Sequence, residues 1–139
     1  MAQVNVKWLE KLRFVGTDST KHSVVLSSSD EENGIGMKPS ELMLVSFGGC
    51  TAYDMVNILT KKRQKLTSLE VEVTGEQEPD PPWTFTSIHL SYRLRGRGLS
   101  EKAVKDAIEL SKAKYCSVGS TLAKAVDVTY DYAIEKEET

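Results

Sequence analysis

The chain of 139 residues contains two cysteines, and these are the side chains best suited to chemistry. Cys50 follows two glycines inside an apolar segment, and Cys116 directly precedes the segment SVGSTLAKAV. A cysteine thiolate is a nucleophile, so either residue could react with an electrophilic or oxidising substrate. The alternative interpretation of Cys50 is a small buried hydrophobic residue without a chemical role. Because the two cysteines do not form a Cys-x-x-Cys motif, whether they meet depends on the fold.

Polar side chains share the helical face of Cys50. Four of them fall on its side at about 100° per residue, namely Ser46, Tyr53, Asp54 and Asn57. This stripe predicts either a reactive face on an apolar helix or a surface that faces solvent. An unpaired carboxylate raises the pKa of a neighbouring thiol, so a reactive Cys50 beside Asp54 would need a nearby cation.

Cys116 is predicted to lie at the start of a short helix that is capped by Ser117. The helix dipole and the free amides of the first turn favour a negative charge at this place. The position therefore predicts that the thiolate form of Cys116 is stabilised.

A long helix must carry Cys50. Pro39 suits the first turn of a helix and no further proline follows for a long stretch, so we predict about 25 helical residues that end near Lys65. Apolar residues cover nearly every side of this helix, which is typical of a buried central helix. Gly48 and Gly49 each cost about 1 kcal/mol relative to alanine, so we expect a close backbone approach or space for a ligand there.

Alternating apolar and polar residues predict strands on both sides of the long helix. The predicted strands lie around residues 4–8, 24–26, 69–74, 88–95 and 126–134. Ser100 is the predicted N-cap of a second, amphipathic helix. Its expected core face contains Ala103, Val104, Ala107, Ile108 and Ser111. Since strands and helices do not alternate regularly, the order favours an antiparallel α+β fold.

We predict one domain over residues 1–139, with a flexible polar loop at about 27–38 and an acidic tail at about 135–139. A helix of about 25 residues is about 38 Å long, which is comparable to the diameter of a domain of this size. One chain is therefore not expected to cover a helix that is apolar on all sides, and we expect two chains to form the folded unit.

The composition excludes several classes of function. The formal charge of −2 gives no general attraction to nucleic acid or to anionic membranes. Charged residues or glycine interrupt the apolar stretches before the ~20 residues needed to span a bilayer. His22 and His89 lack the spacing of metal ligands. Two cysteines and an N-terminus without a signal-peptide pattern predict a cytoplasmic protein with reduced thiols.

Several short motifs resemble the OsmC/Ohr family, which comprises osmotically inducible protein C and the organic hydroperoxide resistance proteins. The motifs are Pro39-Ser40-Glu41-Leu42, Gly48-Gly49-Cys50-Thr51-Ala52, Ile58-Leu59, Lys61-Lys62-Arg63-Gln64 and Lys114-Tyr115-Cys116-Ser117-Val118. The likeness extends from about residue 3 to residue 134, and the motifs are specific in combination.

The resemblance implies an OsmC-like α+β fold, built as an intertwined homodimer with active sites at the subunit interface. It also implies a thiol peroxidase for organic hydroperoxides in oxidative stress defence, with Cys50 as the peroxidatic and Cys116 as the resolving cysteine. The first thiolate would attack the O–O bond and become a sulfenic acid, which the second thiol converts to a disulfide. An external dithiol would then reduce the disulfide. No metal, flavin or haem cofactor is needed for this chemistry.

Two positions depart from the pattern of the well-studied peroxidases of this family. Where these carry a glutamate, the chain has Ser40, and Glu41 lies one residue later. A regular helix places Glu41 opposite Cys50, so it would act through a distorted helix start or across a dimer interface. Alternatively, Glu41 is a first-turn glutamate that favours the helix dipole. Arg13, the only arginine before the helix, is the candidate cation for the thiolate, although its neighbours do not match the arginine loop of the family.

The chain thus resembles a less-characterised branch of the family, and two other functions remain open. The apolar residues around Met43, Phe47 and Cys50 could hold a small lipid-like ligand in a non-enzymatic binding protein. The cysteines could also act as a thiol redox sensor. Whether Cys50 and Cys116 approach each other separates the redox functions from simple ligand binding.

Overall fold

The computed structural model describes residues 1–137, which form two compact units. The N-terminal unit covers Met1–Met43, and the C-terminal unit begins at Leu44. Helix α1 (Pro39–Lys61) begins in the first unit and continues through the second. Because both cysteines belong to the C-terminal unit, that unit positions the candidate site.

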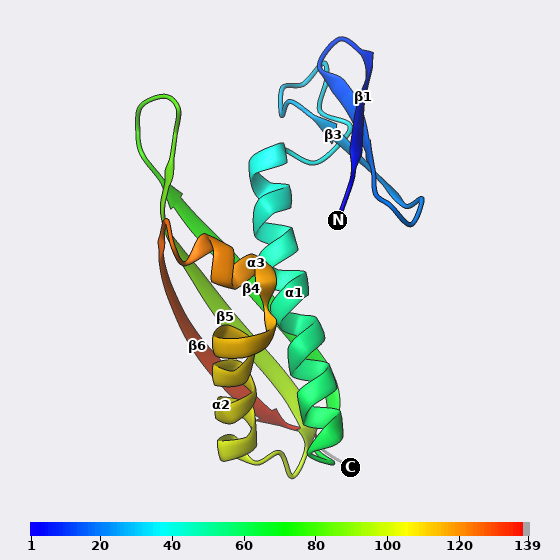
Figure 1. Cartoon of the computed structure of the whole chain (residues 1–139). Coiled ribbons are helices and arrows are strands. Elements are labelled where there is room, and N and C mark those ends of the chain that lie inside the picture. The colour runs from blue at the N-terminus through cyan, green and yellow to red at the C-terminus, as the bar shows by residue number, and fades with distance from the viewer. Residues whose placement is uncertain (138–139) are drawn as a thin grey trace. The chain divides into compact units, whose positions relative to one another are not determined.

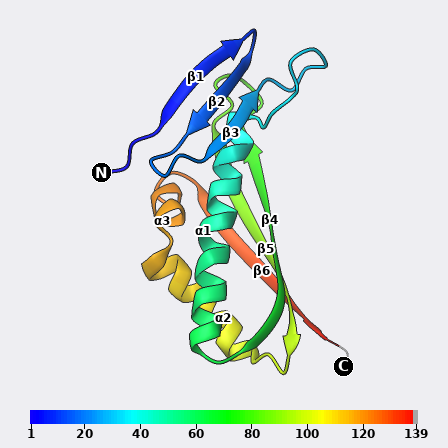
Figure 2. The same cartoon turned by 90° about the vertical axis from the view of Figure 1, so that its right-hand side faces the viewer.

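The N-terminal unit contains a three-stranded antiparallel sheet in the order β1-β2-β3 (Figure 2). Its strands are β1 (Asn5–Glu10), β2 (Arg13–Thr17) and β3 (Ser23–Ser27). The strands predicted near residues 4–8 and 24–26 are confirmed as β1 and β3. The sequence does not predict β2, because RFVGT lacks a clear alternation of apolar and polar residues. Every residue of β1 is exposed, so this unit does not cover the predicted buried face of that strand.

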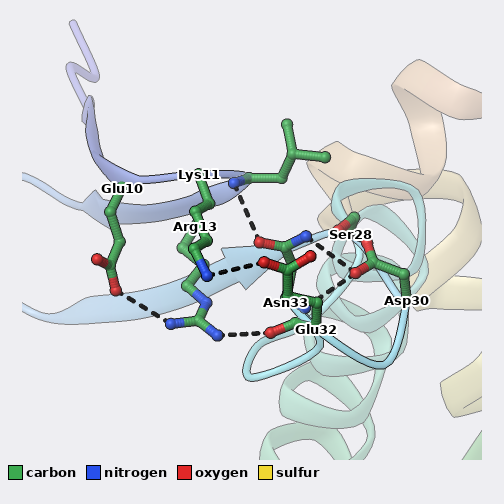
Figure 3. Close-up of polar contacts among 8 residues, drawn as sticks. Glu10, Lys11, Arg13, Ser28, Asp30, Glu32 and Asn33 are labelled. Carbon is green, nitrogen blue, oxygen red and sulfur yellow. Dashed lines mark hydrogen bonds and ion pairs between the residues drawn. The ribbon is translucent and has the colours of Figure 1, made fainter.

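A polar segment, residues 28–38, joins β3 to α1. Within it, the Asp30 carboxylate accepts hydrogen bonds from the Ser28 hydroxyl and from the backbone N–H of Asn33 (Figure 3). These bonds lower the pKa of Asp30 to about 2. Asn33 is buried, and its side-chain oxygen lies 3.4 Å from the backbone nitrogen of Leu12. The segment therefore contacts the turn between β1 and β2, and its flexibility stays a prediction.

The C-terminal unit contains a second three-stranded sheet in the order β4-β5-β6. Its strands are β4 (Lys65–Gln77), β5 (Phe85–Arg97) and β6 (Asp127–Lys136). β4 and β5 pair antiparallel, but β5 and β6 pair parallel, which corrects the antiparallel prediction for the last strand. The long helical connection between these two strands allows the chain to return in the same direction. Of the predicted acidic tail, Glu135 and Lys136 belong to β6, and residues 138–139 lie outside the described residues.

Three helical segments connect β5 to β6. They are α2 (Glu101–Leu110), the π-helical turn η1 (Ser111–Tyr115) and α3 (Ser117–Leu122). Figures 1 and 2 show α1 and α2 on the same face of the sheet. The Ser100 hydroxyl accepts a hydrogen bond from the N–H of Ala103, which confirms the predicted N-cap of the second helix. Two small sheets with a long helix confirm the predicted α+β class.

The core of the C-terminal unit is formed by α1, α2 and one face of the sheet. Its fully buried side chains include Met55, Leu59, Ile88, Leu94, Val104 and Ile108. The long helix ends at Lys61, earlier than predicted, because Arg63 adopts a left-handed φ of 59° and Lys65 already begins β4.

α1 buries only one side within a single chain. Met55 and Leu59 on this helix are completely buried, whereas Val45, Tyr53 and Val56 are exposed, Tyr53 by 73%. An exposed apolar side is what we expect of a helix that one chain of this length cannot cover.

α1 is also long and apolar enough, by length and composition, to cross a membrane. This corrects the expectation that no stretch of the chain reaches that length. The core helix of a soluble protein passes the same test; in α1 Met55 and Leu59 are completely buried, and 33% of the apolar stretch is buried within one chain.

Candidate functional site

The structure brings Cys50 and Cys116 together. Cys50 lies in the middle of α1, and Cys116 lies between η1 and α3. Their side chains lie close enough to interact, and Cys50 is one of the groups that raise the pKa of Cys116. Cys116 is only 3% exposed, whereas Cys50 is partly exposed. A reactant from solvent therefore meets Cys50 rather than Cys116.

The backbone on both sides of Cys116 fixes its position. The N–H of Cys116 donates to the carbonyl of Ser111 at 2.8 Å, which is the bond that closes the π-helical turn η1. Cys116 itself, rather than the predicted Ser117, is the N-cap of α3. In this position its sulfur accepts a hydrogen bond from the N–H of Gly119 at 3.3 Å.

Burial keeps Cys116 protonated. Desolvation and the hydrogen bond to Cys50 raise the pKa of Cys116 to about 12, and the negative charge of Asp54 adds to this increase. The N–H of Gly119 acts in the opposite direction but does not outweigh burial. The prediction that a helix N-terminus stabilises a thiolate at this position is therefore wrong. Cys116 is a protonated thiol at neutral pH.

A buried chain of hydroxyl groups ends at Asp54. Ser111 Oγ lies 2.8 Å from Asp54 Oδ2 and 3.1 Å from Thr51 Oγ1, and Thr51 Oγ1 lies 2.7 Å from the Tyr92 hydroxyl. Ser111 has one proton, and an ionised carboxylate can only accept. Ser111 therefore donates its proton to Asp54. In the hydrogen bond between Ser111 and Thr51, the Thr51 hydroxyl is then the donor. Burial raises the pKa of Tyr92, so its hydroxyl remains a donor at neutral pH.

The predicted polar stripe on α1 divides into two parts. Asp54 is buried within the hydroxyl chain, whereas Tyr53 and Asn57 are exposed. Neither interpretation of the stripe is correct for all of its members. Asp54 is not unpaired, because Ser111 donates a hydrogen bond to it, but its negative charge still raises the pKa of the neighbouring Cys116 thiol.

Three members of the hydroxyl chain, Thr51, Ser111 and Tyr92, are not predicted as site residues. For Ser111 and Tyr92, the sequence does contain a pattern that indicates burial. Ser111 continues the apolar face of the second helix, and Tyr92 lies on the apolar face of its strand. A hydroxyl group on a buried face needs a hydrogen-bond partner, so such positions are candidates for a polar network.

A small cavity adjoins Cys116 inside the C-terminal unit. Its volume is about 50 Å³, and its lining includes Phe47 and Gly119. Pockets for drug-sized ligands measure about 300–1,000 Å³, so this cavity by itself does not hold a lipid-like ligand. Within residues 1–137, no group of three or more His, Cys, Asp or Glu side chains is placed to hold a metal ion.

The two glycines before Cys50 have different surroundings. A Cβ atom at Gly48 would lie 2.9 Å from Val73, so the expectation of a close approach is confirmed there. Nothing lies within 4 Å of a Cβ atom at Gly49. Gly49 instead lines an open groove of about 770 Å³ together with the exposed Tyr53 and Val56.

Arg13 and Glu41 belong to the N-terminal unit. Arg13 Nη1 lies 3.0 Å from the Glu10 carboxylate, and Nη2 donates to the carbonyl of Glu32 at 2.6 Å (Figure 3). Glu41 is exposed in the first turn of α1, 3.7 Å from Lys38 Nζ, a place where a glutamate favours the helix dipole. The support of the reactive thiol by these two residues stays a prediction.

Comparisons with known proteins identify relatives of this chain. A family model described as OsmC-like protein matches residues 30–131. Protein YhfA of Escherichia coli strain K12 is 39% identical over 132 residues, which are 95% of this chain and 97% of YhfA. The solved structure of an OsmC-like protein from Mycoplasma pneumoniae is similar with a TM-score of 0.84 at 15% identity, and 96% of each chain is covered. The organic hydroperoxide resistance protein OhrB of Bacillus subtilis is similar with a TM-score of 0.64 at 12% identity, over 96% of this chain and 98% of OhrB. At these identities the two structures show a shared fold.

Proposed function

Because the chain belongs to the OsmC-like protein family, we propose that it is a thiol-dependent peroxidase that reduces organic hydroperoxides in oxidative stress defence. Membership of this family suggests peroxide or redox chemistry in general. The observation that carries the specific proposal is the contact between the partly exposed Cys50 and the buried thiol of Cys116.

The proposed reaction has two steps on the protein. A thiolate at Cys50 attacks one oxygen of the hydroperoxide, the O–O bond breaks, and the released alkoxide takes up a proton to become the alcohol. Cys50 is left as a sulfenic acid. The sulfur of Cys116 then attacks the sulfur of this sulfenic acid, and the hydroxyl leaves as water together with the proton of the Cys116 thiol. An external dithiol reduces the resulting disulfide and is itself oxidised.

Thiol counting tests this proposal. We expect the reduced protein to lose both free thiols on addition of cumene hydroperoxide and to gain one intramolecular disulfide. Cys50→Ser is expected to keep its remaining thiol, since Cys116 is buried and protonated. Dithiothreitol should restore both thiols of the wild type. Unchanged thiols after prolonged exposure to the hydroperoxide would contradict the proposal.

The thiol of Cys116 also supports the first step in this proposal. As a protonated thiol beside Cys50, it can donate a hydrogen bond to a thiolate there, which is part of the support that a cation would supply. Serine at position 116 keeps a donor, whereas alanine does not. Hydrogen bonds to charged groups contribute about 1.5–3 kcal/mol, so we expect Cys116→Ala to form the Cys50 sulfenic acid about tenfold more slowly than Cys116→Ser. Trapping with dimedone measures both rates, and equal rates would contradict this role.

We propose further that two copies of the chain form the active protein, with the reactive cysteines at the interface. Large apolar side chains are exposed in each unit of a single chain. In the N-terminal unit they include Val6, Trp8 and Leu9, and on α1 they include Val45, Tyr53 and Val56. Monomeric soluble proteins rarely expose large apolar patches, so a second copy is the expected cover. Light scattering should give about twice the chain mass of 15.4 kDa, and a monomer at micromolar concentration would contradict the proposal.

We place this reaction in the cytoplasm, where the reducing environment keeps both thiols available. Ser40 occupies the position of the family's glutamate, so we propose the neighbouring Glu41 as its substitute. We also propose Arg13 as the cation that stabilises the Cys50 thiolate. Arg13→Ala tests the second proposal, since removing the cation would slow sulfenic acid formation at Cys50. An unchanged rate in this variant would assign Arg13 to the N-terminal sheet alone.

A further inference from the structure

We propose that Asp54 and Ser111 are positioning residues, which hold Cys116 beside Cys50 so that the disulfide can close. This inference rests on the proposed function and deepens it, because it concerns the second step of the same reaction. Neither residue touches the reacting oxygen atoms in the steps described above.

Ser111 is joined to Cys116 by its backbone and to the helix that carries Cys50 by its side chain. Its carbonyl accepts the backbone N–H of Cys116 at 2.8 Å. Its hydroxyl is bound to two residues of α1, the helix that carries Cys50, at 2.8 Å from Asp54 and 3.1 Å from Thr51. Ser111 therefore ties the backbone of one cysteine to the helix of the other.

Asp54 is the anchor of this link on α1. It lies one helical turn after Cys50, and it is buried. Its carboxylate accepts the Ser111 proton, so the side chain of Ser111 has one preferred direction. Asp54 also lines an open cleft of about 490 Å³, and the cationic residues Lys61 and Lys62 line the same cleft.

The π-helical turn explains why a side-chain anchor is needed. A turn closed by an i→i+5 bond is less common and less regular than an α-helical turn, and it often lies at a functional site. Here η1 leads directly into Cys116. Without the Asp54 carboxylate or the Ser111 hydroxyl, the link from η1 to α1 is lost. Cys116 can then move away from Cys50, although the backbone bond of the turn can still form.

A redox equilibrium with glutathione tests this inference without any peroxide. Two molecules of reduced glutathione and the protein disulfide exchange with one molecule of oxidised glutathione and the two protein thiols. The equilibrium constant is the effective concentration of one protein thiol toward the other. A misplacement of about 1 Å can cost about 100-fold in such proximity effects. We expect Asp54→Ala and Ser111→Ala to lower the effective concentration at least about tenfold.

Two further variants separate positioning from other effects. Asp106→Ala removes a carboxylate from the exposed side of α2, where it pairs with Lys102, and should leave the effective concentration unchanged. Asp54→Asn keeps an acceptor oxygen in place of the carboxylate, so it should retain most of the wild-type value. If Asp54→Ala fails to fold by near-ultraviolet circular dichroism, Ser111→Ala still decides the question.

The outcomes for the two proposals are distinct. A wild-type value in Ser111→Ala overturns the positioning role, whatever happens with hydroperoxides. An equal loss in Asp54→Asn and Asp54→Ala also overturns it, because the loss would then follow the charge rather than the hydrogen bond. If the wild type forms the disulfide with glutathione but does not react with cumene hydroperoxide, the peroxidase proposal fails and the positioning role stands.

Discussion

Gly119→Ala is expected to affect the chemistry of the cysteines more than the stability of the fold. A Cβ atom at this position would lie 2.8 Å from Phe47 Cε1 and 3.2 Å from Cys116 Sγ. Non-bonded carbon atoms prefer separations of about 3.5–4.0 Å, so the Phe47 ring would have to move by about 0.7 Å or more. Phe47 is 4% exposed and Cys116 is 3% exposed, so neither has free space toward solvent.

Two opposite effects decide the stability of this variant. Replacing glycine with alanine inside a helix stabilises by about 1 kcal/mol, whereas extra atoms in a packed core destabilise by about 1–3 kcal/mol. We therefore expect the free energy of unfolding in urea to fall by about 0–2 kcal/mol. Ser120→Ala is a matched control, because Ser120 is exposed on the same helix and its replacement adds no atom beside Cys116.

The effect on the cysteine pair should be larger. The new methyl group displaces the Cys116 sulfur, which must align with Cys50 for the disulfide to form. Since small misplacements strongly reduce proximity effects, we expect the effective concentration of the Cys116 thiol toward Cys50 to fall at least about tenfold. Adding Phe47→Leu removes the ring atoms that the methyl meets and should restore most of the loss. If Gly119→Ala stabilises the protein by about 1 kcal/mol and forms the disulfide as readily as the wild type, the packing inferred around Cys116 is wrong.

Three further changes test other parts of the structure. Because the pKa of Cys116 is raised in the folded protein, the unfolded chain loses this proton at a lower pH, and the free energy of unfolding should fall as pH rises from about 8.5 toward 12. Cys116→Ser removes this titration and should reduce the pH dependence of the free energy of unfolding by up to about 1.4 kcal/mol per pH unit, as measured in urea titrations. Tyr92→Phe leaves the buried Thr51 hydroxyl without one partner and should lower the free energy of unfolding by about 1 kcal/mol; no change would show that this bond contributes nothing. Trp8→Lys places a charge on the exposed face of β1 and should shift light scattering toward the monomer mass of 15.4 kDa; an unchanged mass would place the dimer contact elsewhere.

Most of the fold follows from local patterns in the sequence. The long helix begins at Pro39 as predicted, and Ser100 caps the second helix. Two features could not be predicted locally. β2 lacks an alternating pattern, and its place in the sheet depends on pairing with β1 and β3 on its two sides. The parallel pairing of β6 depends on the path of the whole helical connection rather than on the residues of the strand.

The candidate site was predictable only as a pair of reactive residues. The family motifs around Cys50 and Cys116 identify both cysteines, but the sequence does not give their burial. For Cys116, the effect of a helix N-terminus was predictable from the residues that follow it. The desolvation that outweighs this effect comes from residues distant in the sequence, so its direction required the structure. The role of Ser111 depends on a π-helical turn, which no pattern in the sequence indicated.

The unequal burial of the two sulfurs sets the order of events in the proposed reaction. A second thiolate beside a Cys50 thiolate would place two negative charges in contact in a poorly solvated site, which is unfavourable. The raised pKa of Cys116 avoids this and leaves one donor and one acceptor. It also makes Cys116 a poor nucleophile toward the hydroperoxide itself, because the thiolate is the reactive form. Once Cys50 carries a hydroxyl group, the Cys116 proton can leave with that hydroxyl as water. Burial therefore suppresses reaction of Cys116 with the hydroperoxide, and its position beside Cys50 directs it toward the sulfenic acid.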